Sequence, residues 1–138
     1  MPSVPILRAI ERAGQLTNRY LSIHLAELSI TEVEMHVLLH LTDRSQVTIA
    51  EVQRWFGLRP STLTSVLDRL ERRGFVTREL NPEDRRSFLV ALTPTGETVA
   101  SAVVDLLQEL EGSIRSRVRE EDVAAFLEVA DAVAQVTE

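Results

Sequence analysis

The sequence predicts a mainly α-helical α+β fold in one domain, residues 1–138, and three observations support that prediction. Apolar residues recur at helical spacing along most of the chain. Two segments, SITEVEM and VTIAEV, carry a threonine followed three residues later by a glutamate, which is a signature of a helix start. Two short β-rich segments flank a turn that contains asparagine and proline, which predicts a β-hairpin.

Composition sets the broad class of protein. The chain is 44% hydrophobic and 26% charged, as is ordinary for a soluble globular protein. No apolar run approaches the roughly 20 residues of a membrane helix, and the first residues lack the pattern of a secretion signal, so we expect a cytoplasmic protein. The absence of cysteine excludes disulfides, thiolate nucleophiles and thiolate metal ligands.

The first third of the chain predicts two helices. Residues 5–28 have apolar residues at helical spacing. A second helix begins at Thr31, whose side chain can cap the helix while Glu34 reaches back to it. Ile30 and Met35 occupy the positions of a hydrophobic staple, which sets the direction in which the chain enters the helix.

The same pattern predicts a short third helix. Thr48 and Glu51 form the second capping box, and Val47 and Val52 form its staple. Gly57 ends this helix, because glycine readily adopts the left-handed conformation that commonly follows a last helical turn.

A fourth helix is predicted from Pro60 to Arg73. Proline suits the first turn, because its missing N–H would be unpaired there anyway. Gly74 is the natural terminator. A single apolar stripe runs along the helix and consists of Leu63, Val66, Leu67 and Leu70.

A β-hairpin follows the fourth helix. Residues 75–80 and 88–92 are rich in β-branched, aromatic and apolar residues and are the predicted strands. The turn between them contains Asn81 and Pro82, both of which favour turns.

Two further helices are predicted from about residue 93 to 118 and from about 121 to 136. These helices and the first one carry more apolar surface than three central helices can cover. We therefore predict a two-fold homodimer, with residues 1–29 and 94–138 as dimerisation helices and residues 30–93 as the central part. The last helix shows the apolar spacing at Phe126, Leu127, Ala130, Val133 and Ala134.

Two helices joined by a glycine turn, in TIAEVQRWFGLRPSTLTSVLDRL, predict a helix-turn-helix. Its second helix carries small hydroxyl residues opposite the apolar stripe, with arginines further along. Small hydroxyl groups let a helix approach a DNA groove closely and bond to phosphates or base edges. The alternative is that this face is an ordinary solvated surface. The face consists of Ser61, Ser65, Asp68 and Arg72, flanked by Thr64 and Arg69.

The charge of the chain is unevenly distributed. Its net charge is −6, but residues 57–87 hold seven arginines against five acids. Residues 97–138 hold ten acids against three arginines. The acidic total therefore does not argue against DNA binding, because the predicted helix-turn-helix lies largely in the basic middle of the chain.

Two adjacent arginines, Arg85 and Arg86, lie in the turn of the predicted hairpin. A hairpin that follows a helix-turn-helix and carries arginine at its tip is a winged-helix arrangement, in which the hairpin is called the wing. Arginine suits the minor groove of DNA, where negative potential is concentrated. The alternative is that the tip is a solvated charged turn.

Residues 58–96 carry a resemblance to a known family. The run from LDRLERRGFVTR through PEDRRS to LTPTG resembles the MarR family of multiple-antibiotic-resistance regulators, and the resemblance spans nearly the whole chain. It implies that the helix from Pro60 to Arg73 lies in the major groove and that Arg86 enters the minor groove. It also implies that Asp84 shapes the wing loop and that Arg69 lies near the DNA backbone.

Two positions depart from the family's pattern. Arg59 stands where a serine or aspartate usually caps the helix from Pro60 to Arg73, which is called the recognition helix. The arginine implies a less firm helix start and one more cation near phosphate. Gln53 replaces a small alanine where the two helices pack, which implies a slightly different crossing. The predicted DNA-binding residues are Arg59, Ser61, Thr62, Thr64, Ser65, Arg69, Arg72, Asp84, Arg85 and Arg86.

The histidines suggest a ligand rather than a metal. His36 and His40 lie four residues apart on the second helix, a spacing compatible with a metal site, and His24 lies on the first helix. The long fifth helix offers no histidine and the chain has no cysteine, so we predict no metal site and no cofactor. The resemblance implies a pocket for a small-molecule effector, which we place at Tyr20, His36 and His40.

The sequence does not predict an enzyme, because it has no glycine-rich phosphate loop, no nucleophile elbow and no paired carboxylates in a recognisable context. We predict a sequence-specific DNA-binding transcriptional regulator, a ligand-responsive repressor that binds a palindromic operator as a homodimer. The alternative is a winged-helix module that binds another protein and has no specific DNA site.

Overall fold

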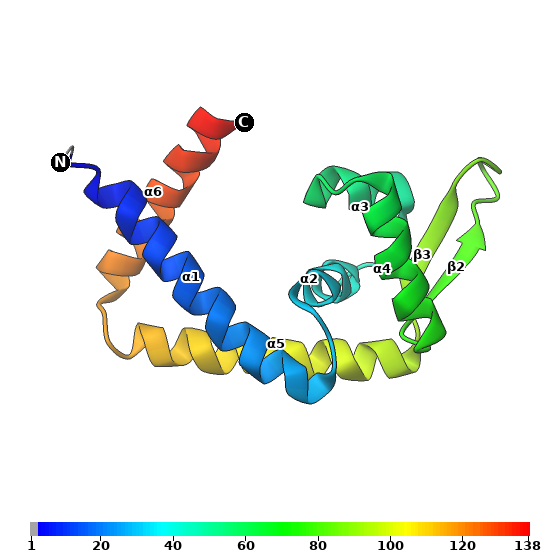
Figure 1. The fold of residues 1–138 in the computed structure, drawn as a ribbon, viewed down its shortest axis with the longest axis horizontal. Helices are drawn as coiled ribbons and strands as arrows, with labels where there is room; N and C mark the ends of the chain where they lie inside the picture. The colour runs from blue at the N-terminus through cyan, green and yellow to red at the C-terminus, as the bar shows by residue number, and fades with distance from the viewer. Residues whose placement is uncertain (1–2) are drawn as a thin grey trace. The chain divides into compact units, whose positions relative to one another are not determined.

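The computed structural model describes residues 3–138 and is drawn as a ribbon in Figure 1. The described residues divide after Val103 into two structural units. The first unit holds the predicted helix-turn-helix and hairpin, and the second holds the last turns of the fifth helix and the whole of the sixth. No helix within residues 3–138 combines the length and apolarity that crossing a membrane requires. The elements are α1 (Pro5–Leu25), η1 (Ala26–Leu28), α2 (Glu32–Leu41), β1 (Val47–Thr48), α3 (Ile49–Phe56), α4 (Pro60–Arg72), β2 (Val76–Leu80), β3 (Phe88–Leu92), α5 (Pro94–Arg115) and α6 (Glu120–Thr137).

Both predicted capping boxes are confirmed. The Thr31 hydroxyl accepts a hydrogen bond from the backbone N–H of Glu34 (3.2 Å), and the Glu34 carboxylate accepts one from the N–H of Thr31 (3.3 Å). Thr48 and Glu51 form the same pair of bonds at the start of α3, each 3.1 Å long. These bonds satisfy backbone donors that no helical carbonyl can reach. The predicted staple residues beside the two boxes are buried, namely Ile30, Met35, Val47 and Val52.

The first helix ends earlier than predicted. α1 ends at Leu25, and the next three residues form the 3₁₀ turn η1. Ser29 then adopts the left-handed conformation, with φ of 55°, and the N–H of Ile30 donates to the carbonyl of Leu25 (3.3 Å). A left-handed residue with such a bond is a common way to end a helix, although glycine usually supplies it. The serine at this position carried no helix-ending signal.

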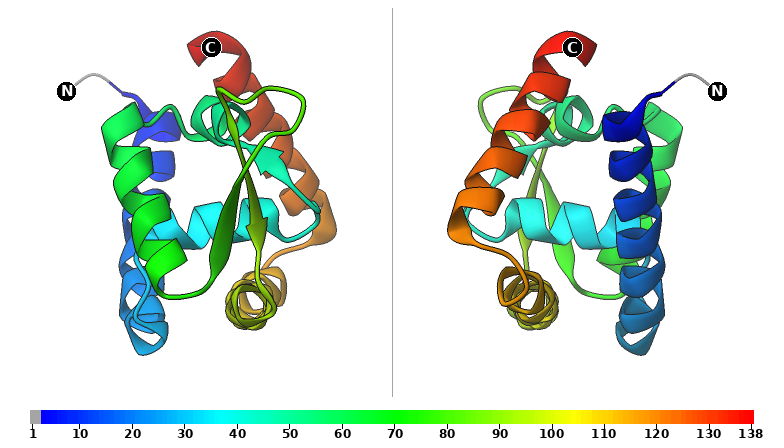
Figure 2. Two further views of the ribbon diagram at one scale, coloured as in Figure 1. Left: turned by 90° about the vertical axis from the view of Figure 1, so that its right-hand side faces the viewer. Right: turned by 90° about the vertical axis from the view of Figure 1, so that its left-hand side faces the viewer.

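The predicted hairpin is confirmed, and a third strand joins it. β2 and β3 pair antiparallel from Val76 opposite Leu92 to Leu80 opposite Phe88. β1 pairs with the other edge of β3, so the strand order is β1-β3-β2. Figure 2 shows the loop that joins β2 to β3 at the free end of the hairpin. Sequence periodicity did not reveal β1, because two residues are too few to show an alternating pattern.

The core of the first unit lies between the helices and the small sheet. The apolar stripe of α4 is confirmed, since all four of its residues are buried. The same core takes side chains from α1, α2, α3, the sheet and the first turns of α5. Its largest fully buried side chains are Leu25, Met35, Leu38, Leu41, Leu63, Leu67 and Leu70.

The start of α5 is tied to the end of the helix-turn-helix. The N–H of Thr93 donates to the carbonyl of Phe75 (3.0 Å), and the Thr93 hydroxyl donates to the carbonyl of Gly74. The same hydroxyl accepts from the N–H of Gly96 (3.0 Å), which makes Thr93 the side-chain cap of α5. A Cβ atom at Gly96 would overlap the backbone oxygen of Phe75 and lie 2.8 Å from its carbonyl carbon. The LTPTG segment therefore needs its threonine and its glycine for this close approach.

Candidate nucleic-acid interface

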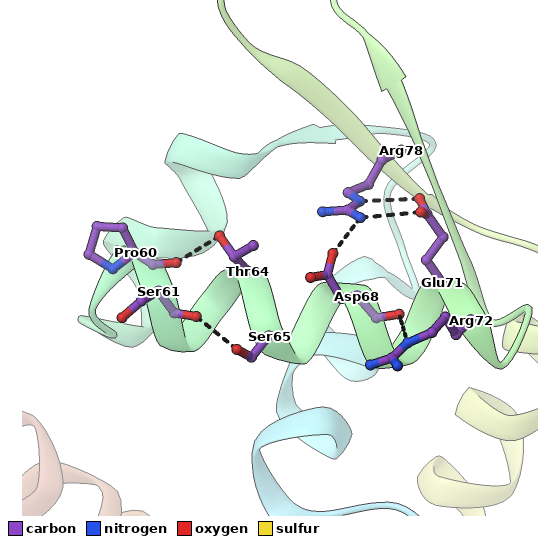
Figure 3. Close-up of polar contacts among 8 residues, drawn as sticks. All are labelled: Pro60, Ser61, Thr64, Ser65, Asp68, Glu71, Arg72 and Arg78. Carbon is purple, nitrogen blue, oxygen red and sulfur yellow. Dashed lines mark hydrogen bonds and ion pairs between the residues drawn. The ribbon is translucent and has the colours of Figure 1, made fainter.

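The predicted recognition helix is α4, and its polar face is exposed at Ser61, Ser65 and Arg72 and half-buried at Asp68. Figure 3 shows these side chains along the helix. The Thr64 hydroxyl donates to the carbonyl of Pro60 (2.9 Å), and the Ser65 hydroxyl donates to the carbonyl of Ser61 (3.1 Å). Thr62 is also exposed. The first two turns of α4 thus present short hydroxyl side chains that lie close to the helix. No long side chain there would keep a DNA groove away from the helix backbone.

The start of α4 lacks a side-chain cap, in keeping with the arginine found at position 59. This residue occupies the N-cap position with extended backbone (φ −62°, ψ 143°) and forms no side-chain cap bond, and its side chain is exposed. Pro60 supplies the first turn. Gly57 ends α3 in the left-handed conformation (φ 59°), and Gln53 donates from its side chain to the carbonyl of Leu58 (3.4 Å). Gln53 at the end of α3 is therefore bonded to the turn that leads into α4.

The arginines in the second half of α4 differ in what they contact. Arg72 is exposed, and its Nε donates to the carbonyl of Asp68 (3.3 Å) in the same helix. Arg69 Nε lies 3.9 Å from Oε1 of Glu34, a buried carboxylate that also caps α2. The Arg69 side chain is nevertheless 47% exposed, so solvent reaches it from the other side.

A third arginine, Arg78, forms a charged cluster between β2 and α4 that no pattern in the sequence indicated. Its Nη2 lies 2.6 Å from Oδ1 of Asp68, and its Nε lies 3.1 Å from Oε2 of Glu71 (Figure 3). The hydrogen bond from Arg78 holds the pKa of Glu71 below its usual value. Arg78 therefore neutralises two acids of the predicted recognition helix and joins that helix to the wing.

Replacing Arg78 with alanine should weaken binding to all DNA duplexes. The change leaves Asp68 and Glu71 unpaired on a helix that is predicted to lie against phosphates. Repulsion of about 1 kcal/mol for each acid is the order of magnitude for like charges about 4 Å apart in water. Titration of a labelled duplex by fluorescence anisotropy should show a loss of about tenfold or more. Adding Asp68→Asn and Glu71→Gln to the variant should restore most of the affinity. Failure of this restoration would show that the cluster acts only by joining the helix to the wing.

The loop at the tip of the wing is held by short-range hydrogen bonds. Oδ1 of Asp84 accepts from the backbone N–H of Arg86 (3.0 Å), and Oδ1 of Asn81 accepts from the N–H of Glu83 (3.0 Å). Asn81 also donates from its side-chain amide to the hydroxyl of Ser87 (3.1 Å). The backbone of the loop is thereby shaped by its own polar side chains.

The two arginines of the tip remain exposed. Within residues 3–138, neither Arg85 nor Arg86 takes part in an ion pair, whereas Arg78, Arg115 and Arg119 each pair with acids. The tip therefore presents two cations that have no ion-pair partner among the described residues, on a loop whose backbone is held by Asp84.

The residues predicted for an effector pocket fall into two groups. Tyr20 stacks on His24 of the same helix, with ring centroids 4.0 Å apart. His36 and His40 instead lie beside Phe56 of α3, at centroid distances of 6.2 and 5.8 Å. Four surface hollows of the first unit are lined by other residues. Among residues 3–138, no group of three or more His, Cys, Asp or Glu side chains is arranged to hold a metal ion.

His40 should make folding stability depend on pH. Burial lowers the pKa of His40, Arg44 lowers it further and Glu51 opposes the shift, while its Nε2 is buried without a hydrogen-bond partner in the described chain. Because the unfolded histidine has the higher pKa, of about 6.5, the free energy of unfolding should fall as the pH drops below that value. Urea titrations between pH 5 and 8 measure this fall. His40→Phe should remove the fall and His36→Gln should retain it; the reverse pattern would contradict the assignment.

Comparison with known proteins identifies the family. The model of the MarR family matches residues 30–88. The multiple antibiotic resistance protein MarR of Escherichia coli is 30% identical over 124 residues, which cover 89% of this chain and 86% of that protein. The organic hydroperoxide resistance transcriptional regulator of Bacillus subtilis is 33% identical over 92 residues, 67% of this chain and 62% of that protein.

The solved structures agree with these relatives. A crystal structure of a cysteine-to-serine mutant of E. coli MarR, complexed with operator DNA, superposes with a TM-score of 0.82 at 29% identity. The superposition covers 94% of each chain. The B. subtilis relative is named a transcriptional regulator, and the superposed E. coli protein is bound to operator DNA. The chain therefore belongs to the MarR family, and it is a winged-helix DNA-binding transcriptional regulator.

Proposed function

We propose that this regulator is a repressor that binds an inverted-repeat operator as a homodimer, with α4 in the major groove and the wing in the minor groove. The observation that carries the proposal is the tip of the wing, where Arg85 and Arg86 are exposed and form no ion pair within residues 3–138, while Asp84 holds the loop. The exposed hydroxyl face of α4 in the same unit supports it. The regulator would act where the chromosome lies, which in a prokaryote is the cytoplasm.

Exposed apolar side chains at both ends of the chain support the homodimer. In the first unit, Ile6 and Leu7 of α1 are exposed, and in the second unit Phe126 and Leu127 of α6 are 58% and 54% exposed. Monomeric soluble proteins rarely expose large apolar patches of this kind. A second copy of the chain that covers them would present two recognition helices related by a two-fold axis.

Selection of bound sequences from random duplex DNA tests the proposal. A two-fold dimer should select an inverted repeat with half-sites about one helical turn apart. Its affinity should fall steeply as salt rises, because phosphate contacts release counterions. Sedimentation at micromolar concentration should show a dimer. A folded dimer that binds no duplex, or binds independently of salt, would favour the alternative of a protein-interaction module.

We also propose that a small molecule modulates this binding by contacting α2 beside His36 and His40. The observation in favour is the buried Nε2 of His40, which has no hydrogen-bond partner in the described chain and lies in a ring-rich setting beside Phe56. A buried polar atom without a partner is unusual and can serve a ligand. Screening small aromatic acids for release of operator DNA, with wild type and His40→Phe in parallel, tests this; release that is equal in both would exclude the histidine.

Replacing residues of α4 should separate DNA positioning from base readout. Arg69→Ala should weaken specific and non-specific duplexes alike and reduce the salt slope by about one, if Arg69 neutralises a phosphate. Ser65→Ala or Thr64→Val should instead change the preferred base at one half-site position. Competition assays with single-base operator variants, repeated at several salt concentrations, measure both effects. Equal losses in all three variants would mean that the hydroxyl residues contact only the backbone.

A further inference from the structure

Two neighbouring arginines at the end of α4 have different partners. Among residues 3–138, Arg72 bonds only within its own helix, through Nε to the carbonyl of Asp68. Arg73, the C-cap residue, reaches across the first unit to the end of η1, where its Nη1 donates to the carbonyl of Ser29, the C-cap residue of η1. Its Nη2 donates to the carbonyl of Leu28 (3.3 Å). The second arginine therefore connects the recognition helix to a segment 44 or 45 positions earlier in the chain.

Arg73 has two further contacts. Its Nη1 lies 4.0 Å from Oε2 of Glu34, a buried carboxylate oxygen that has no hydrogen-bond partner in the described chain. Its guanidinium carbon lies 4.6 Å from the centre of the Phe75 ring, an arrangement typical of a cation–π contact. One side chain thus contacts the end of η1, the first turn of α2 and the residue just before β2.

The chemistry of this site favours arginine over a simple cation. Residues at the end of a helix have carbonyl groups without helical partners, which carry partial negative charge. The left-handed conformation of Ser29 ends η1 here, and two successive carbonyls accept bonds from two nitrogens of one guanidinium. The planar guanidinium offers several donors in fixed directions, whereas lysine offers a compact ammonium without this geometry.

We propose that Arg73 is a positioning residue that fixes the recognition helix against the end of the α1–η1 segment, and that it does not contact DNA. This inference rests on the proposed function, in which α1 contributes to the dimer and α4 reads DNA. If α1 is anchored in the dimer, the angle between α1 and α4 sets the distance between the two recognition helices. Arg73 then determines which spacing of half-sites the dimer accepts.

Replacements of Arg73 and Arg72 in the full chain test the inference. The probes are the selected operator, two versions with one base pair added or removed between the half-sites, and a random duplex. One base pair moves a half-site by about 3.4 Å along the helix axis, so a rigid dimer should discriminate against both altered operators. Affinity is measured for each probe at several salt concentrations, and circular dichroism and sedimentation verify folding and dimerisation.

We expect Arg73→Lys to keep the salt slope and the affinity for random duplex of the wild type, because the charge is retained. Its discrimination against altered spacing should fall at least about fivefold, since the ammonium cannot reproduce both carbonyl bonds. Arg73→Gln should also keep the salt slope while losing discrimination. Arg72→Gln, the matched control, should lower the salt slope by about one and keep the spacing preference, as a phosphate contact would.

Two results would overturn the inference while leaving the proposed function intact. One is a wild-type spacing preference in Arg73→Lys, which would show that a point charge suffices. The other is a salt slope lowered by about one in Arg73→Gln, which would show that Arg73 neutralises a phosphate. A wild-type protein that binds no duplex would instead overturn the proposed function and the inference with it.

Discussion

Arg86→Ala should lower the affinity for operator DNA by about 1–3 kcal/mol, the range of a good groove contact. Arg86 lies exposed on a loop whose backbone is held in place, so little ordering is lost when it enters a groove. Narrow A·T-rich minor grooves concentrate negative potential. The loss should therefore be largest on operators with A·T-rich flanks, as measured by anisotropy titration on operators that differ only in their flanks.

Two neighbouring acids provide the control for the wing. Asp84→Ala should also weaken binding, although less, because the carboxylate that accepts from the N–H of Arg86 is lost. Glu83→Ala removes the same charge from the same exposed loop, but its carboxylate holds no backbone group among the described bonds. Simple electrostatics predicts tighter binding for both variants. If Asp84→Ala binds as tightly as Glu83→Ala, and Arg86→Ala is insensitive to the flanks, the tip is only a solvated turn.

Gly96→Ala should lower the free energy of unfolding by about 3 kcal/mol, the upper part of the range for overpacking in a tight site. The added Cβ would overlap the backbone oxygen of Phe75, and a backbone atom cannot rotate away as a side chain can. The strain would pull apart the contact that the Thr93 N–H makes with the carbonyl of Phe75. Urea denaturation of the purified protein measures the change.

Gly112 is the matched control, because it lies in the same helix and a Cβ atom added there would have no neighbour within 4 Å beyond the helix's own backbone. Gly112→Ala should raise the free energy of unfolding by about 0.5–1 kcal/mol, since alanine loses less backbone entropy in a helix. Equal effects of the two substitutions would show that the segment around residue 96 can move to make room. Opposite signs would confirm the close approach at the start of α5.

Local signals in the sequence predicted most of the fold. The capping boxes of Thr31 and Thr48 involve residues three apart, and the stripe of α4 repeats within one helix, so each could be recognised without knowledge of the tertiary structure. β1 was missed because its two residues become a strand only by pairing with Val90 and Leu89 of β3. The end of α1 was missed because Ser29 takes a conformation that usually calls for glycine.

The candidate site could be predicted less completely, and the arginines show why. Composition grouped the seven arginines of residues 57–87 as one basic region. The structure separates Arg78, which is bound by Asp68 and Glu71, from Arg86, whose side chain has no acidic partner among the described residues. A long side chain can reach a partner many positions away, and no periodic pattern records such a pair. Formal charge therefore overstates the number of cations that DNA can meet.

The hydroxyl groups of Thr64 and Ser65 act as hydrogen-bond acceptors on the outer side of α4. Each gives its only hydrogen to a carbonyl one turn earlier, so each faces outward with lone pairs alone. While the hydrogen stays on the helix carbonyl, phosphate oxygens, which have no hydrogen to donate, cannot bond to such a group; a phosphate contact requires the hydroxyl to rotate. In the major groove, the exocyclic amines of adenine and cytosine are the base-edge donors. A base pair that bonds to either hydroxyl in this geometry must therefore present one of those amines to the helix. Guanine O6 and N7 are acceptors, and the hydroxyl has no free hydrogen to donate to them.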